Sequence, residues 1–265
     1  MKTIVISIIC CALLSGSMFS QNITSLNEAA VHAVDPAARI NKLQFQPNYY
    51  IYFGGGNQFN LTSRIIHSFN GIYFPFIKSR NPKKLYSVVR VEVPVTSQTY
   101  GLNSPLNATG LSDITCLDVL VNKTRWGSFG GGASFSFPTA TCPALGSGKW
   151  MIGFSGIIMS SVIKGWMLGL LFQQYFSVAG TPSKPPKNYM LIQPMINYFI
   201  GKGYFLGYTS IITLDWEADA YTLPLSLGFG KAFARNFTLM LTPEYFLTGP
   251  MKKSFLIQLN INAMF

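Results

Sequence analysis

Charged side chains are scarce in this sequence, and acidic ones are the scarcest. Only 11% of the 265 residues are Asp, Glu, Lys or Arg, while 49% are hydrophobic, and soluble domains carry roughly 25% charged residues. A soluble protein of this composition could not cover its surface with polar groups, whereas a membrane protein faces lipid and does not need to. The composition therefore favours a membrane protein, with one large β domain or two ordinary domains in a chain of this length.

Histidine and cysteine are also scarce. The two histidines, His32 and His67, form no cluster with the cysteines that would have the spacing of a zinc site. Cys116 and Cys142 lie in the body of the chain, where an exported protein could pair them or leave two thiols. We expect no metal and no cofactor.

Residues 1–20 have the pattern of a secretory signal peptide. Lys2 supplies the positive charge, residues 4–14 form the apolar stretch, and small residues follow at Ser15 to Ser17 and at Ser20. Cleavage would remove the other two cysteines, Cys10 and Cys11. The sequence therefore predicts an exported chain.

The last twelve residues alternate between apolar and polar side chains. Successive side chains of a strand point to opposite faces, so this pattern predicts a strand with one apolar face and one amide face. The apolar positions include Phe255, Ile257 and Phe265, and the amides are Gln258, Asn260 and Asn262. A terminal strand that ends on Phe resembles the closing strand of bacterial outer-membrane β-barrels. That resemblance implies that the barrel-assembly machinery recognises Phe265.

Eleven further segments upstream show the same two-residue period. Each has the length of a tilted strand that crosses a bilayer, and an even number of strands is typical of bacterial barrels. The segments are 43–53, 58–68, 85–95, 112–122, 126–137, two that meet at 160–165, 189–199, 204–215, 221–231 and 236–246. The sequence therefore predicts an all-β fold, a transmembrane antiparallel β-barrel of about twelve strands at residues 43–265. Residues 21–42, mildly helical until Pro36, should form a periplasmic amino-terminal segment, either a linker or a segment inside the lumen.

The stretch from Met151 to Phe172 permits another interpretation. It contains a single charged residue, Lys164, and is long enough for a transmembrane helix. Its four glycines and the polar turn at 160–165 divide it into two alternating segments, which favours two strands. Only helices and closed barrels satisfy the backbone in lipid, so helical spans are the alternative to a barrel.

The connections and the tryptophans agree with a barrel. Three connections on the expected outer side are long (96–111, 138–148 and 177–188), and all four tryptophans fall at strand ends, where barrels carry aromatic girdles. Two early connections fit badly, because 54–57 is short for an outer loop and 69–84 is long for an inner turn. A strand boundary between residues 58 and 95 could therefore be misplaced.

Polar side chains on the inner face of these strands should line the lumen and the path of a solute. The candidates are Arg90, Glu92, Asp118, Gln193, Asn197, Asp215, Glu217 and Glu244. Arg90 and Glu92 are two residues apart on one face and could form an ion pair, as a structural pair or as a substrate contact. The basic residues behind the net charge of +11 are scattered over turns. We therefore expect contacts with outer-membrane lipid and lipopolysaccharide, and none with nucleic acid.

Catalytic motifs are weak. Residues 146–149 resemble part of a phosphate-binding loop. The full motif needs glycine at the position of Pro143 and Ser or Thr at the position of Trp150, so it is absent. The only histidine in a predicted strand, His67, has Ser63 and Ser68 as chance neighbours, which leaves an outer-membrane lipid-acting enzyme as an alternative. We predict no catalytic residues and no enzyme.

Several short motifs are similar to those of a family of outer-membrane transporters, labelled MetA-pathway-of-phenol-degradation-like and often "neuromedin U". They lie at 110–114, 137–141, 145–150, 177–180, 191–194, 211–213 and 215–219. The resemblance implies a channel or transporter in the cell outer membrane for small molecules, aromatic or hydrophobic ones among them. The chain departs from the family in the loop with Cys142 and at 69–84. A structural or adhesive surface barrel is a further alternative.

Overall fold

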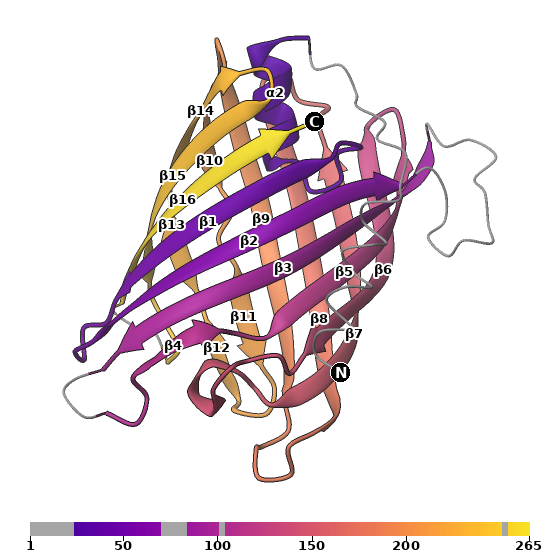
Figure 1. Cartoon of the computed structure of the whole chain (residues 1–265). Helices are drawn as coiled ribbons and strands as arrows, with labels where there is room; N and C mark the ends of the chain where they lie inside the picture. The colour runs from indigo at the N-terminus through magenta and orange to yellow at the C-terminus, as the bar shows by residue number, and fades with distance from the viewer. Residues whose placement is uncertain (1–23, 70–83, 101–103, 251–253) are drawn as a thin grey trace.

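The computed structural model describes residues 24–69, 84–100, 104–250 and 254–265 (Figure 1). The predicted signal peptide and nearly all of the 69–84 connection lie outside these ranges. The described residues fold as a closed antiparallel β-barrel of twelve strands. The predicted fold class is confirmed.

Ten of the twelve wall strands are continuous. They are β1 (Lys42–Ile51), β2 (Asn57–Phe69), β3 (Leu85–Thr99), β5 (Ile114–Lys123), β6 (Gly127–Phe137), β7 (Lys149–Ser160), β8 (Trp166–Gly180), β9 (Asn188–Gly201), β15 (Phe237–Phe246) and β16 (Phe255–Met264). A short strand, β4 (Ala108–Leu111), pairs with the end of β3 ahead of β5. The chain also forms a helix, α2 (Leu26–Val34), and a 3₁₀ turn, η1 (Pro143–Leu145).

The ninth and tenth wall strands are interrupted. The ninth consists of β10 (Tyr204–Tyr208) and β11 (Ile212–Asp215), and the tenth consists of β12 (Ala220–Thr222), β13 (Pro224–Ser226) and β14 (Gly228–Ala234). β10 pairs with β14 and β11 pairs with β12, but β13 pairs only with β15 on its other side. The ladder between the ninth and tenth strands is therefore broken around Ser210.

The carboxyl-terminal strand closes the barrel. β16 pairs with β15 on one side and with β1 on the other, from Lys42 opposite Met264 to Ile51 opposite Phe255. Closure joins the first wall strand to the last, so within the described residues neither of these two strands has a free edge. Gln258, Asn260 and Asn262 face the interior, as the alternation predicts.

The outer surface carries the apolar side chains. Phe154, Ile158 and Leu170 are exposed, as are all four tryptophans near the ends of their strands. No helix in the described ranges is long and apolar enough to cross a membrane. The stretch from 151 to 172 consists of most of β7, the turn at 161–165 and the first part of β8, which confirms its division into two strands.

The face of β5 differs from the prediction. Directly opposed residues of antiparallel strands share a face, and Asp118 lies opposite Val89 of β3 and Ala133 of β6 on the outer face. Leu117 and Val119 instead face the interior. The prediction assigned the polar side chains to the lumen, and it was wrong here because the interior at this level is apolar.

The amino-terminal segment fills that apolar part of the lumen. Ser25 caps α2 by accepting the N–H of Glu28 at 3.1 Å, and Ala29 and Ala30 are fully buried. The small alanine face lets the helix pack closely on inward side chains of the barrel, which include Phe205, Ala232, Met240 and Met264. Residues 24–40 are hereafter the plug, the plug end is where β1 begins and β16 ends (Figure 1), and the mouth end is opposite.

Candidate functional site

The barrel encloses a cavity of about 670 Å³. Its floor includes Ala33, Val34 and Pro36 of the plug, and its walls come from strands around the whole barrel. The volume lies within the range of pockets that hold a small organic molecule. The cavity is therefore the candidate site for a solute.

The plug end of the cavity is apolar. Inward side chains of β2, β3, β5, β7, β8 and β9 form one buried cluster with Ala37 of the plug, and Val31 and Val34 pack against it. Tyr86 donates its hydroxyl to the carbonyl oxygen of Ala37 at 2.6 Å. The cluster members that also line the cavity are Ile66, Val88, Leu117, Val119, Val121, Ile157, Leu171 and Met195.

Lys42 fastens the plug to the first wall strand. Its ammonium donates to the carbonyl oxygens of His32 at 3.3 Å, Ala33 at 3.1 Å and Asp35 at 3.5 Å. These groups form the carboxyl end of α2, where a cation is stabilised by the helix dipole and by unpaired carbonyls. Burial lowers the pKa of His32, so the neutral imidazole adds no second positive charge beside Lys42.

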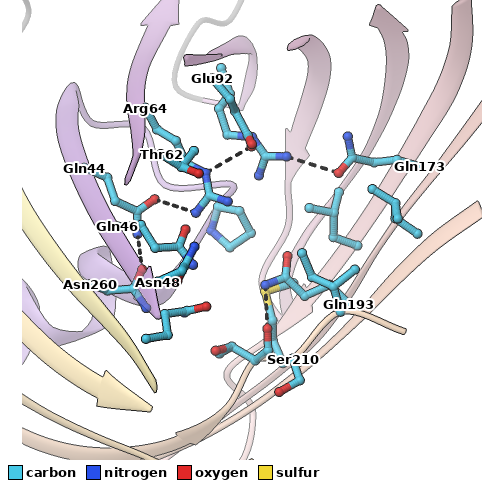
Figure 2. A pocket seen from close by; sticks show the side chains of 18 of the residues that line it. Gln44, Gln46, Asn48, Thr62, Arg64, Glu92, Gln173, Gln193, Ser210 and Asn260 are labelled. Atoms are coloured by element: carbon cyan, nitrogen blue, oxygen red, sulfur yellow. Dashed lines mark hydrogen bonds and ion pairs between the residues drawn. The ribbon is translucent and has the colours of Figure 1, made fainter. Parts of the chain in front are cut away.

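An ion-pair cluster lies midway along the lumen. One oxygen of Glu92, Oε1, lies 3.1 Å from Nε of Arg64 and 2.9 Å from Nε of Arg90. Arg64 also donates to Oε1 of Gln44 at 3.2 Å, and Arg90 donates across the lumen to Oε1 of Gln173 on β8 at 3.1 Å. Figure 2 shows these side chains converging from opposite walls. The cluster crosses the cavity and narrows it.

A second polar group bridges the broken ladder. Ser210 donates to a carboxylate oxygen of Glu244 and contacts the hydroxyl of Ser226 at 2.5 Å. Tyr208 donates its hydroxyl to the carbonyl oxygen of Pro224 at 2.9 Å. These side-chain contacts take the place of the missing backbone hydrogen bonds between the ninth and tenth strands.

Aromatic rings lead from the mouth end into the cavity. Tyr100 stacks on Tyr52 at 5.5 Å between ring centroids, Tyr52 on Tyr50 at 6.2 Å, and Tyr50 on Phe246 at 6.4 Å. Tyr50 and Phe246 line the cavity. This row of four rings is hereafter the aromatic row.

The predicted lining residues fall into two groups. Arg90, Glu92, Gln193, Asp215 and Glu244 line the cavity. The carboxylate of Asp215 is engaged within its own turn, where Oδ1 accepts the N–H groups of residues 217 and 218, each at 3.1 Å.

The other three predicted residues lie off the cavity wall. Asn197 is on the inner face but fully buried beside Gly207 at the plug end. Glu217 is exposed in the turn after β11, and Asp118 faces outwards. Glu217 was misassigned because it lies beyond the strand, which ends at Asp215 in the structure as in the predicted segment.

Two of the charged residues that shape the site were not among the predicted ones. Arg64 has the same parity as the amide Asn60, so the alternation contained the signal for it. Lys42 had no such signal, because its partners are carbonyl groups of a helix whose position depends on the tertiary fold.

Three of the family-like motifs meet at Asp113, at the mouth end. Its Oδ2 accepts the N–H and the hydroxyl of Ser147, each at 2.7 Å, and its Oδ1 accepts the N–H of Ala140 at 3.2 Å. A side chain at Gly146 would lie 2.5 Å from Asp113 Oδ1, so glycine permits this close approach. These motifs shape a loop and contribute no group to the cavity.

The remaining candidates do not form a site. Cys116 and Cys142 are both free thiols. His67 and Ser68 are adjacent on β2 and therefore point to opposite faces, while Ser63 is four residues from His67, about 13 Å along the strand. His67 therefore has neither serine as a hydrogen-bonded partner.

Comparisons with known proteins give a fold and no family. No protein-family model matches the chain, and no curated protein does. Among solved structures, the outer membrane channel from Pseudomonas putida F1 is similar with a TM-score of 0.64 and 16% identity, covering 85% of this chain and 94% of that one. The NanC porin has a TM-score of 0.55 and 8% identity, covering 83% of this chain and 98% of its own. The chain thus has the fold of an outer-membrane channel.

Proposed function

We propose that the protein is a channel or transporter of the bacterial outer membrane for small molecules, aromatic or hydrophobic ones among them. This is also the role implied by the resemblance to the MetA-pathway-like transporters. The observation that supports it best is that a single cavity is lined both by the inner rings of the aromatic row, Tyr50 and Phe246, and by the apolar side chains of its plug end. A flat apolar solute could pass from ring to ring without losing favourable contacts.

The plug implies that passage is controlled. It occupies the lumen at the plug end, so a solute can pass from the cavity through that end only when the plug shifts or when the solute passes beside it. The short helix is held by alanine packing, by Lys42 and by Asn27, whose Oδ1 accepts the N–H of Gly203 at 2.8 Å, and within the described residues no backbone ladder joins it to the wall. We therefore propose that the barrel wall stays fixed while the plug moves.

The proposed position in the membrane follows from the outer surface of the barrel. The belt of exposed apolar side chains would contact outer-membrane lipid and lipopolysaccharide, with Phe265 read by the barrel-assembly machinery. We propose these partners together with a periplasmic position of the plug end.

Swelling of proteoliposomes tests the proposed function. Phenylalanine and glutamine are both zwitterions that cross lipid slowly, and only phenylalanine carries a ring. Liposomes with the purified full-length protein should swell faster in phenylalanine than in glutamine, although phenylalanine is larger. Equal rates would refute an aromatic preference, and no swelling in either solute would refute transport.

A further inference from the structure

We propose that Arg64 and Arg90 bind the carboxylate of a small organic monoanion, whose aromatic or aliphatic body rests on the apolar floor of the cavity. This inference rests on the proposed function and names the class of solute. It follows from the charge, the free donors and the neighbours of the two arginines.

The cluster has one positive charge too many. Arg64 and Arg90 share a single oxygen of Glu92, and the three side chains are only 16%, 15% and 19% exposed. A poorly solvated charge is costly unless it is paired. Two guanidinium groups and one carboxylate leave a net charge of +1 that one bound anion would neutralise.

The guanidinium groups also have donors to spare. Each arginine has five N–H donors, and within the described residues each makes one contact to Glu92 and one to an amide oxygen. Gln44 and Gln173 are neutral, so they orient the guanidinium groups without neutralising them. The planar fork of arginine matches a carboxylate in two-point contact.

Other charged groups of the cavity are already engaged. The Lys42 ammonium is held by carbonyls of α2, the Glu244 carboxylate by Ser210 and the Asp215 carboxylate by its own turn. Neutral partners hold these three groups without neutralising them, and the described lining has three cations and three anions, so the excess positive charge is a local one at Arg64 and Arg90.

The neighbours of Arg90 supply a surface for an apolar body. Ile66 of β2 and Leu117 of β5 lie directly opposite it on the same face, and Val88 is two residues along β3 towards the plug end. All three line the cavity. A molecule with its carboxylate at the guanidinium groups would place its body on these side chains, which selects for an amphiphilic anion.

Three probes of similar size test the charge preference. Calorimetric titration of the detergent-solubilised full chain with benzoate, benzamide and benzylamine compares an anion, a neutral molecule and a cation that share one phenyl ring. Benzoate should bind at least about tenfold more tightly than benzamide, because a charge-assisted contact exceeds a neutral one by roughly the free energy of one decade of affinity. Equal binding of the three, or a preference for benzylamine, would overturn the inference.

Substitutions in the cluster give effects of opposite sign. Arg90→Gln should weaken benzoate about tenfold and leave benzamide unchanged, whereas Glu92→Gln should strengthen benzoate, since it removes the competing carboxylate. If Glu92→Gln weakens benzoate as much as Arg90→Gln does, the cluster has only a structural role. Glu217→Gln, which removes a carboxylate on the exposed turn, is the matched control and should change neither affinity.

The outcomes separate this inference from the proposed function. Heat-modifiable gel migration shows whether each variant is folded. If Arg90→Gln does not fold, Arg64→Lys takes its place. This variant keeps the charge but loses the planar fork, so it should lose part of the benzoate affinity. A barrel that passes phenylalanine but shows no benzoate preference refutes only the carboxylate site. A barrel that prefers benzoate but passes no solute refutes only transport.

Discussion

The two halves of the lumen are built on different principles. The mouth end is lined by amides, charged groups and the aromatic row, and its side chains bond to one another across the space. The plug end is lined by aliphatic side chains that bury the alanine face of α2. One half therefore offers a polar site to a solute, and the other resembles the core of a soluble protein that lies inside a barrel.

This difference decides which kind of interaction stabilises each half of the lumen. In the mouth half, polar groups are costly to leave unpaired, so single substitutions should act through charge. In the plug half, burial of small apolar surfaces holds a short helix, so single substitutions should act through volume, except at Lys42, which acts through charge. Four substitutions test this contrast.

The largest effect should follow from Glu92→Ala. It leaves Arg64 and Arg90 facing each other without a carboxylate, and breaking a poorly solvated ion pair costs about 3 kcal/mol. Reversible urea unfolding in detergent should show a loss of that size in the free energy of unfolding. Glu217→Ala, on the exposed turn, serves as the control, and an equal small loss in both variants would contradict the account of the cluster.

A steric substitution comes next. Ala30→Trp has no space beside the barrel wall, since Ala30 is 1% exposed, and overpacking costs about 2 kcal/mol. The helix should no longer pack inside the lumen while the barrel stays folded. The lumen would then be wider, so single-channel conductance in planar bilayers should rise. Val162→Trp places the same ring on an exposed turn and should leave conductance unchanged, and a rise in both variants would refute the mechanism.

Lys42→Met should have a smaller effect on the plug. It removes the ammonium from the carboxyl end of α2 and costs about 1 kcal/mol of docking free energy. Limited proteolysis should cut residues 24–40 faster than in the wild type. Lys42→Arg keeps the cation and should protect the segment. Equal cleavage of both variants would therefore argue that the positive charge at residue 42 does not hold α2 in place.

The smallest effect should come from Asp118→Asn. Its carboxylate faces outwards, opposite Val89 and Ala133, so its removal should leave the ion selectivity of the pore unchanged. Reversal potentials in a salt gradient measure this directly. A clear shift in selectivity would mean that β5 presents Asp118 to the lumen after all.

The sequence predicted the barrel well, because most wall strands keep an apolar outer face and place their polar side chains on the opposite face. β16 and β8 are examples, since Gln258 and Gln173 face inwards as their parity requires. The rule depends on a polar lumen. It failed for β5, where Leu117 faces an apolar interior and Asp118 faces out, so polarity pointed to the wrong face.

The site was predictable only where chemistry is local. The pairing of Arg90 with Glu92 follows from two positions on one strand. The contact of Arg90 with Gln173 crosses the lumen, and that of Lys42 with α2 depends on where the plug lies. Neither contact leaves a periodic trace in the sequence, because both join elements whose distance is fixed only when the barrel closes.

Single-channel conductance of the protein without residues 24–40 tests the central claim most directly. The deletion keeps Asn41, whose carbonyl oxygen accepts the N–H of Phe265 at 3.0 Å, so the closing contact of the barrel survives. The account predicts a conductance several-fold larger than that of the full-length protein, since the plug fills the lumen at one end. Equal conductance of the two proteins, both folded by heat-modifiable migration, would contradict it.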